Sequence, residues 1–364
     1  MGEPLKVGVI GAGTIAGQYS ASLARLPETR VTAVCDLVPE RAEALAAEHG
    51  ARAVALPELL AADDVDAVLV LTLPATHGEV ALDALSAGKH VYVEKPLALS
   101  VAEGREVVKA AAAAGLRLGC APDTVLGTGL QTARAVVDAG RIGTPHSATA
   151  FMTTPGHERW HHDPEFYYRR GGGPLLDMGP YYLSALIHLL GPVARVVGAS
   201  SRPSGTRTIA QGPRAGTSFD VTVDTHVTAI LEHASGALST LVMSFDTWAA
   251  RLPRIEVYGT AGSLSVPDPN TFDGTVELYP ASGDDRWSDV GVLAGFAGAG
   301  RGYGLADLAR GLAEARPHRA NGDIALHVLE IMEAVLQAAE ARASITLTTT
   351  CERPDPVVGV PELA

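Results

Sequence analysis

The stretch that decides the fold is residues 5–16, LKVGVIGAGTIA, which joins an apolar run to a glycine-rich turn. The run predicts a buried β-strand over residues 5–10, and the residues after the turn predict a helix over 14–26. Gly11 permits a tight turn, and Gly13 lets the backbone come close to a ligand. A GxGxxA turn between a strand and a helix is typical of dinucleotide-binding folds, in which the helix N-terminus faces a pyrophosphate.

Strands and helices alternate along the first third of the chain. Each helix after the first is followed by a glycine, which is a common C-terminal cap. The strands are continuous apolar runs, as in a parallel sheet that is covered on both faces. We therefore expect an α/β fold whose residues 1–122 form a Rossmann domain with a doubly wound parallel sheet. The further strands are predicted over 31–35, 67–72, 90–93 and 116–120, and the helices over 40–49, 77–87 and 101–114.

The pattern changes after residue 122 and predicts a separate α+β domain over 123–350. Residues 219–231 alternate apolar and polar side chains, and 233–236 predict a turn into another strand. Residues 200–218 are rich in Gly, Pro, Ser and Thr and predict a loop. The tail over 351–364 contains three prolines and is expected to be irregular. Further strands are predicted over 237–245, 254–258, 263–266 and 275–279, and helices over 129–139 and 324–341.

The composition is that of an acidic globular protein. Its 364 residues include 28 Lys and Arg against 41 Asp and Glu, and the net charge of −13 excludes the basic surface that nucleic acid needs. The apolar run at 67–73 is too short to cross a bilayer, and residues 1–6 lack the features of a secretion signal. The 3 cysteines have no CxxC spacing, which favours a reducing compartment. We expect a cytoplasmic protein with no membrane or nucleic-acid partner.

Asp36, at the end of the second predicted strand, indicates which dinucleotide binds. Its carboxylate can accept hydrogen bonds from the ribose hydroxyls of NAD, and it repels the 2′-phosphate of NADP. The residues that follow it directly are apolar, which favours NAD, while Arg41 keeps NADP open as a second cofactor. The residues of this region that are predicted to bind the cofactor are Gly11, Gly13, Thr14, Ile15, Asp36 and Leu37.

Four further motifs resemble those of the Gfo/Idh/MocA oxidoreductases, of the glucose–fructose oxidoreductase and inositol dehydrogenase type. The resemblance covers nearly the whole chain in order. It implies that a domain with a large, mostly antiparallel open sheet follows the Rossmann domain. Such a sheet often forms oligomer contacts, so a homo-oligomer, dimer or tetramer, is expected. The motifs are TLPATH at 72–77, GKHVYVEKPL at 88–97, GGGPLLDMGPY at 171–181 and VYGTAGSL at 257–264.

The resemblance implies hydride transfer between a nicotinamide and a secondary alcohol or ketone of a sugar, sugar derivative or cyclitol. Lys95 is expected to bond the substrate oxygen and to stabilise its developing negative charge. Asp177 is expected to hydrogen-bond the substrate, although a helix N-cap is its alternative role. Tyr181, one helical turn later, is expected to exchange the proton. Many members have His and an acid where this chain has Tyr181 and Ser184, which leaves the substrate open rather than the reaction.

Several other residues are expected near the substrate or the cofactor. The stretch 160–168 is dense in rings for a chain with 5% aromatic residues. Its rings suit the C–H faces of a sugar, and packing of the segment on its own domain is the alternative. The expected substrate wall is Trp160, His161, Tyr167 and Tyr168, and the further residues expected on the cofactor side are Thr72, Leu73, Pro74, His77, Glu94, Lys95 and Asp123.

Residues 157–161, HERWH, match the HExxH pattern of zinc hydrolases and give a competing hypothesis. The pattern needs two histidines on one helix, but Gly156 precedes it and Pro164 follows it. That leaves no more than about two helical turns, because proline cannot continue a helix. We therefore expect no metal. A dinucleotide-binding sensor without turnover is the third hypothesis, and the joint presence of Lys95, Asp177 and Tyr181 argues against it.

Overall fold

The computed structural model describes residues 3–283 and 285–361. The chain folds into two compact units. The first comprises the chain up to Gln131, Leu293–Leu329 and the chain from Pro354 onward, and the second comprises Thr132–Val292 and Glu330–Arg353. This grouping rests on contacts, whereas the boundaries at residues 122 and 350 rest on sequence patterns and remain predictions.

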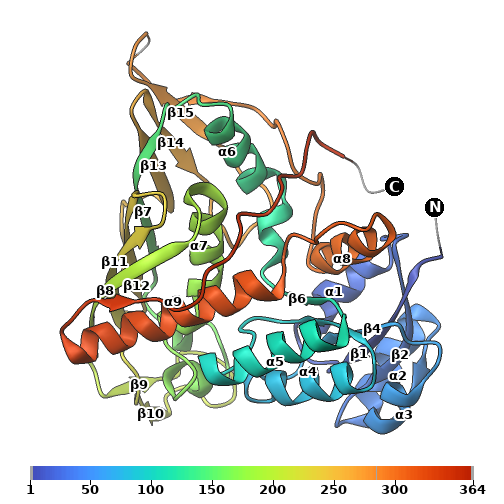
Figure 1. Ribbon diagram of the computed structural model, residues 1–364. Coiled ribbons are helices and arrows are strands. Elements are labelled where there is room, and N and C mark those ends of the chain that lie inside the picture. The colour runs from blue at the N-terminus through green and yellow to red at the C-terminus, as the bar shows by residue number, and fades with distance from the viewer. Residues whose placement is uncertain (1–2, 284, 362–364) are drawn as a thin grey trace. The chain divides into compact units, whose positions relative to one another are not determined.

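The first unit contains a six-stranded parallel sheet with the strand order β3-β2-β1-β4-β5-β6. Four of its strands, β1, β2, β4 and β6, are labelled in Figure 1. All neighbouring strands pair in parallel. This is the order of a dinucleotide-binding doubly wound sheet, so the predicted Rossmann fold is confirmed. The strands are β1 (Leu5–Ile10), β2 (Thr29–Cys35), β3 (Arg52–Ala53), β4 (Ala67–Val70), β5 (His90–Val93) and β6 (Leu118–Cys120).

The helices of this unit bury an apolar face against the sheet. Val68, Val70, Val91 and Val93 of the sheet share one buried cluster with apolar residues of α4 and α5. The predicted glycine caps of α2 and α5 are confirmed, since both adopt the left-handed conformation. Helices α3 and α8 were not predicted from the sequence. The helices are α1 (Ala16–Leu23), α2 (Pro39–His49), α3 (Leu56–Ala61), η1 (Pro74–Thr76), α4 (His77–Ser86), α5 (Val101–Ala114), η2 (Asp123–Leu126) and α8 (Tyr303–Ala313).

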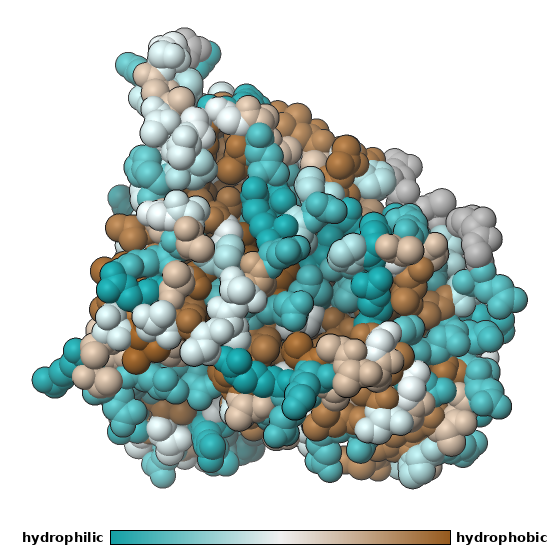
Figure 2. Space-filling model, viewed as in Figure 1, coloured by the Kyte–Doolittle hydropathy of each residue, from teal (hydrophilic) through white to brown (hydrophobic). Residues whose placement is uncertain are grey.

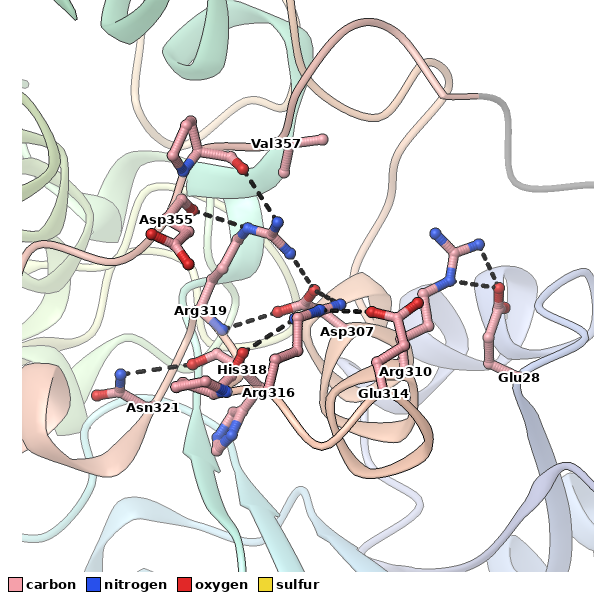
Figure 3. Close-up of polar contacts among 12 residues, drawn as sticks. Glu28, Asp307, Arg310, Glu314, Arg316, His318, Arg319, Asn321, Asp355 and Val357 are labelled. Atoms are coloured by element: carbon pink, nitrogen blue, oxygen red, sulfur yellow. Dashed lines mark hydrogen bonds and ion pairs between the residues drawn. The ribbon is translucent and has the colours of Figure 1, made fainter. Parts of the chain in front are cut away.

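Polar contacts attach the C-terminal segments to the parallel-sheet unit (Figure 3). Arg310 Nε of α8 donates to Glu28 Oε1 at 2.8 Å. Asp307 is fully buried and accepts from the backbone amide of Arg319 at 2.7 Å. Arg319 Nε in turn donates to the carbonyl of Asp355 at 2.8 Å. The end of the chain therefore helps to build a unit that begins at its start.

The segment that contains His318 and Ala320 covers the outer edge of strand β6. The amide of Cys120 donates to the carbonyl of Ala320 at 3.0 Å, and His318 Nε2 lies 3.0 Å from the carbonyl of Leu118. Burial lowers the pKa of His318 to about 4. The ring is therefore neutral near pH 7, and its Nε2–H donates to the carbonyl.

The second unit contains a nine-stranded sheet of order β16-β15-β14-β13-β7-β12-β11-β8-β17. Strands β7 and β12 pair in parallel and the others antiparallel, so the predicted open, mostly antiparallel sheet is confirmed. Helix α7 (Pro174–Leu190) contacts β7, β11 and β12 and is buried along most of its length. The strands are β7 (Pro145–Thr153), β8 (Val193–Ser201), β11 (His226–His233), β12 (Leu238–Ser244), β13 (Ile255–Gly259), β14 (Gly262–Val266), β15 (Glu277–Pro280), β16 (Ser288–Asp289) and β17 (Ile345–Thr346).

Helices α6 (Thr128–Asp138) and α9 (Gly322–Ala341) each contribute residues to both units. None of the described helices is long and apolar enough to cross a membrane. On the face drawn in Figure 2, hydrophilic and hydrophobic residues are interspersed.

Two expectations for residues 200–231 were wrong. The segment 219–231 is not one strand, since β10 (Ser218–Asp220) and β11 belong to different sheets. Between them the amide of Thr222 donates to the carbonyl of Tyr168 at 2.9 Å, which takes the chain out of the ladder. Residues 200–218 are not a plain loop, because β9 (Thr206–Thr208) pairs with β10 as a two-stranded sheet.

Candidate active site

The glycine-rich turn after β1 has the geometry that a dinucleotide requires. Gly11 has φ +101°, and a Cβ there would lie 2.7 Å from the carbonyl oxygen of Leu71, so a side chain does not fit. A Cβ on Gly13 would meet no described atom within 4 Å, so the turn is open on that side. Helix α1 follows with Ile15 as N-cap, no described side-chain cap and no acidic residue in its first turn. A helix N-terminus without an acidic side chain suits an anionic pyrophosphate.

Asp36 links this turn to the end of β2. Its Oδ2 accepts from the amide of Ala12 at 2.7 Å, and its Oδ1 accepts from the amide of Val38 at 2.8 Å. Each carboxylate oxygen has a second lone pair, so both oxygens retain acceptor capacity for ribose hydroxyls. Leu37 is fully exposed beside the carboxylate. The sequence analysis did not foresee that Asp36 also holds the turn itself.

His77 supports two loops at the carboxyl ends of the strands. The ring is buried, with Nδ1 2.7 Å from the carbonyl of Pro96 and Nε2 3.0 Å from that of Thr72. Both ring nitrogens therefore face backbone oxygens, and the place of His77 on the cofactor side stays a prediction. In the loop that follows β4, Leu73 is exposed and Pro74 is half-buried.

Glu94 fixes the backbone of Lys95. Its Oε2 accepts from the amide of Lys95 at 2.7 Å, and its Oε1 accepts from the hydroxyl of Tyr19 in α1 at 2.9 Å. Burial, and then Glu94, raise the pKa of the Tyr19 hydroxyl, which therefore remains a donor. Lys95 is half-buried and follows β5, at the sheet edge where parallel sheets bind ligands.

Asp123, which is expected on the cofactor side, contacts the start of helix α8. It is 0% exposed, and its Oδ2 accepts from the amides of Gly302 at 2.7 Å and Gly304 at 3.1 Å. It therefore caps the start of α8. Burial raises the pKa of Asp123 to about 6, while Arg301 and the two amide bonds act in the opposite direction.

In the second unit, Asp177 and Tyr181 lie on consecutive turns of α7. The N-cap of this helix is Gly173, so Asp177 lies inside the first turn and the capping alternative was wrong. Tyr181 is four residues later on the same side of the helix and is 4% exposed. The neighbouring Tyr182 is fully buried.

His157 is the residue of this site that the sequence analysis missed. Its Nε2 lies 2.8 Å from Asp177 Oδ2. Its ring centroid lies 4.4 Å from those of Tyr167 and Phe245 and 5.1 Å from that of Trp160. The sequence analysis considered His157 as a zinc ligand, and no local pattern pairs it with an acid 20 residues away.

The predicted substrate wall is gathered around His157, with one exception. Trp160 is 57% exposed, and its centroid lies 5.3 Å from His161 and 6.4 Å from Tyr167, which are both half-buried. Burial, and then His162, lower the pKa of the His161 ring and favour its neutral form. Tyr168 is fully buried and donates its hydroxyl to Glu158, so it belongs to the core rather than to the wall.

The HExxH string does not have the geometry of a zinc-hydrolase helix. His157–Arg159 form a three-residue 3-10 helix, η3, in place of two α-helical turns. Glu158 is held by Tyr168 and by Arg207, whose Nη1 lies 2.9 Å from Oε1. Within residues 3–283 and 285–361, no group of three or more His, Cys, Asp and Glu side chains could hold a metal ion. The prediction that the protein needs no metal still awaits a test.

Both units are similar to domains of known proteins. Residues 5–121 match the oxidoreductase family with an NAD-binding Rossmann fold, and residues 130–265 match the C-terminal domain of the Gfo/Idh/MocA proteins. The 1,5-anhydro-D-fructose reductase of Ensifer adhaerens is 32% identical over 289 residues, which cover 77% of this chain and 81% of that protein. A dTDP-3,4-didehydro-2,6-dideoxy-alpha-D-glucose 3-reductase of Streptomyces violaceoruber is 33% identical over 341 residues, or 92% and 95% of the two chains.

A solved structure shares the fold. Levoglucosan dehydrogenase in complex with NADH and L-sorbose superimposes with a TM-score of 0.81 at 20% identity, covering 96% of this chain and 100% of that one. The two units thus define an oxidoreductase with an NAD-binding Rossmann domain. The chain belongs to the Gfo/Idh/MocA family.

Proposed function

We propose that this oxidoreductase exchanges a hydride between NAD and a secondary alcohol or ketone of a sugar, a sugar derivative or a cyclitol. The observation that carries the proposal is the carboxylate of Asp177 beside an aromatic cluster. Hydroxyl groups need such acceptors, and the C–H faces of a sugar ring suit aromatic faces such as those of Trp160 and Tyr167. The two curated relatives named above, which are reductases of an anhydrosugar and of a nucleotide-linked sugar, support the same substrate class.

The residues around the glycine-rich turn are proposed to hold the cofactor. The open side of Gly13 and the uncapped start of α1 suit the pyrophosphate, and Asp36 suits the ribose. When bound, the nicotinamide accepts or supplies the hydride. We assign NAD as the preferred cofactor because Asp36 repels a 2′-phosphate. The cofactor residues of this proposal are Gly11, Gly13, Thr14, Ile15, Asp36, Leu37, Thr72, Leu73 and Pro74.

Lys95, Asp177 and Tyr181 are proposed to act on the substrate. The ammonium of Lys95 bonds the reacting oxygen and stabilises negative charge on it. The hydroxyl of Tyr181 takes the proton of that oxygen in oxidation and returns it in reduction. Asp177 accepts a hydrogen bond from a substrate hydroxyl and so fixes the orientation of the ring.

A spectroscopic screen tests the proposal. NAD⁺ is offered with levoglucosan, myo-inositol and other polyols, NADH with keto sugars, and absorbance is followed at about 340 nm. We expect turnover with at least one compound. Lys95→Ala should lower kcat/KM by at least ~100-fold and leave NADH binding intact. NADH binding without hydride transfer to any compound would instead support the sensor hypothesis.

We also propose a homo-oligomer that forms through the outer face of the nine-stranded sheet. Val197, Ile230 and Leu238 are exposed on the neighbouring strands β8, β11 and β12, and Ile230 pairs directly with Val197. Light scattering should report a dimer or tetramer, and Ile230→Glu should lower its mass. The location that we propose is the cytoplasm, because Cys35, Cys120 and Cys351 are all free and buried.

A further inference from the structure

We propose that His157 is a positioning residue, which orients the carboxylate of Asp177 by donating a hydrogen bond from Nε2–H. The bond itself is a property of the second unit. Its consequence for catalysis rests on the proposed function, in which Asp177 binds the substrate. The imidazole and the carboxylate come from different elements, η3 and α7, and their atoms are 2.8 Å apart.

The surroundings of the ring decide which nitrogen carries the proton. His157 Nδ1 is buried and has no hydrogen-bond partner among the described residues. A proton on Nδ1 would be a buried donor without an acceptor, which is unfavourable. The proton therefore belongs on Nε2, where Asp177 Oδ2 accepts it. The pair consists of an imidazole Nε2–H donor and a carboxylate acceptor.

The ring is held so that it can fix its partner. His157 is 8% exposed and lies edge-on to Tyr167, with an interplanar angle of 74°. Its own amide donates to the hydroxyl of Tyr168 at 3.0 Å. Gly156 before it has φ +107°, and a Cβ there would collide with the carboxylate of Glu158. The backbone on both sides of His157 is therefore constrained.

This arrangement couples two features that a sugar would contact. The same imidazole bonds the acceptor Asp177 and packs against Trp160 and Tyr167 of the wall. A substrate hydroxyl on Asp177 and a substrate C–H face on the wall are thereby given a fixed relative orientation. His157 acts through these side chains and is not itself a group that touches the reacting atoms.

A pair of substitutions separates the hydrogen bond to Asp177 from the mere presence of a polar side chain at position 157. In His157→Gln the side-chain amide nitrogen reaches about as far as Nε2, whereas in His157→Asn it is one carbon shorter. With a substrate found in the screen, His157→Asn should lower kcat/KM by roughly tenfold to a hundredfold, and His157→Gln should recover most of that loss. Calorimetry should show unchanged NAD binding in both variants. Equal activity of His157→Asn and the wild type would overturn the proposal.

A measurement without substrate tests the bond whatever the enzyme acts on. Imidazole ¹⁵N spectra of the full chain resolve the histidines, and the His157 signal is the one that His157→Asn removes. We expect a ring that carries a proton at Nε2 and none at Nδ1, and whose Nε2–H signal shifts in Asp177→Asn. Protonation at Nδ1, or a signal that Asp177→Asn leaves unchanged, would overturn the positioning role. Absence of turnover in the screen, by contrast, would count against the proposed function.

Discussion

Replacing Asp123 by Asn should change how the stability of the protein depends on pH. Asp123 is completely buried, and its Oδ1 has no partner among the described residues. Asn keeps the shape and an oxygen that can accept from the amides of Gly302 and Gly304. It removes the charge, and its amide group adds a buried donor whose cost is independent of pH.

The sign and size of the effect follow from the raised pKa. Burial raises the pKa of Asp123 from 3.8 to about 6 in the folded state. Between these values the folded protein binds more protons than the unfolded chain, so its stability falls as pH rises. The shift of roughly 2 units corresponds to about 3 kcal/mol of unfolding free energy. About 2 kcal/mol of it is lost between about pH 4.5 and about pH 7.5.

Urea unfolding of both proteins at several pH values provides the assay. Asp123→Asn does not titrate, so its stability relative to the wild type should improve by about 2 kcal/mol over that pH range. The absolute difference at one pH is not diagnostic, because it includes the cost of the added amide donor. A difference that stays constant, or that favours the wild type as pH rises, would refute the reasoning. Arg301 and the two amide bonds would then outweigh burial.

Three further predictions concern the cofactor, the proton and the metal. Calorimetry should show tighter binding of NADH than of NADPH, and Asp36→Ala should reduce this difference in affinity. Equal or tighter binding of NADPH by the wild type would contradict NAD as the preferred cofactor. Tyr181→Phe should lower kcat with unchanged NAD affinity, and adding Lys95→Ala should give a double variant little worse than the worse single one. Near-normal turnover of Tyr181→Phe would exclude the tyrosine as proton carrier. Elemental analysis should find no stoichiometric zinc and chelators should leave activity intact, whereas a loss restored by zinc would revive the hydrolase hypothesis.

The parts of the fold that the sequence predicted are those in which local chemistry decides the conformation. The turn at Gly11 and the capped helices α2 and α5 fall where glycine was expected. Strand β7 was not predicted, although the apolar residues Ala148, Ala150 and Met152 alternate with half-buried residues along it. The N-terminus of helix α8 has no described side-chain cap in its own sequence. The carboxylate that accepts from the amide of Gly302 there belongs to Asp123, which is 179 residues away.

The candidate site divides in the same way. Motifs identified Lys95 and Asp177, since each stands in a short recognisable string. The partners of those residues could not be predicted, because tertiary contacts choose them. His157 and its partner Asp177 are 20 residues apart in the sequence. Glu94, which bonds the amide of Lys95, is 75 residues from its other partner, Tyr19. His77, which is expected on the cofactor side, has its two ring nitrogens 2.7 and 3.0 Å from the backbone carbonyls of Pro96 and Thr72, which no local pattern predicts.

The outer edge of β6 has a consequence for the order in which the chain is made. Strand edges with unpaired amides and carbonyls readily pair with other chains. Here the covering residue, Ala320, is synthesised about 200 residues after Cys120, whose amide it binds. The nascent sheet therefore emerges from the ribosome with an open edge, and it stays open until the segment around Ala320 has been synthesised. A chain truncated before Ala320 would keep a sheet whose β6 edge is never covered, and we expect such products to aggregate or to be degraded.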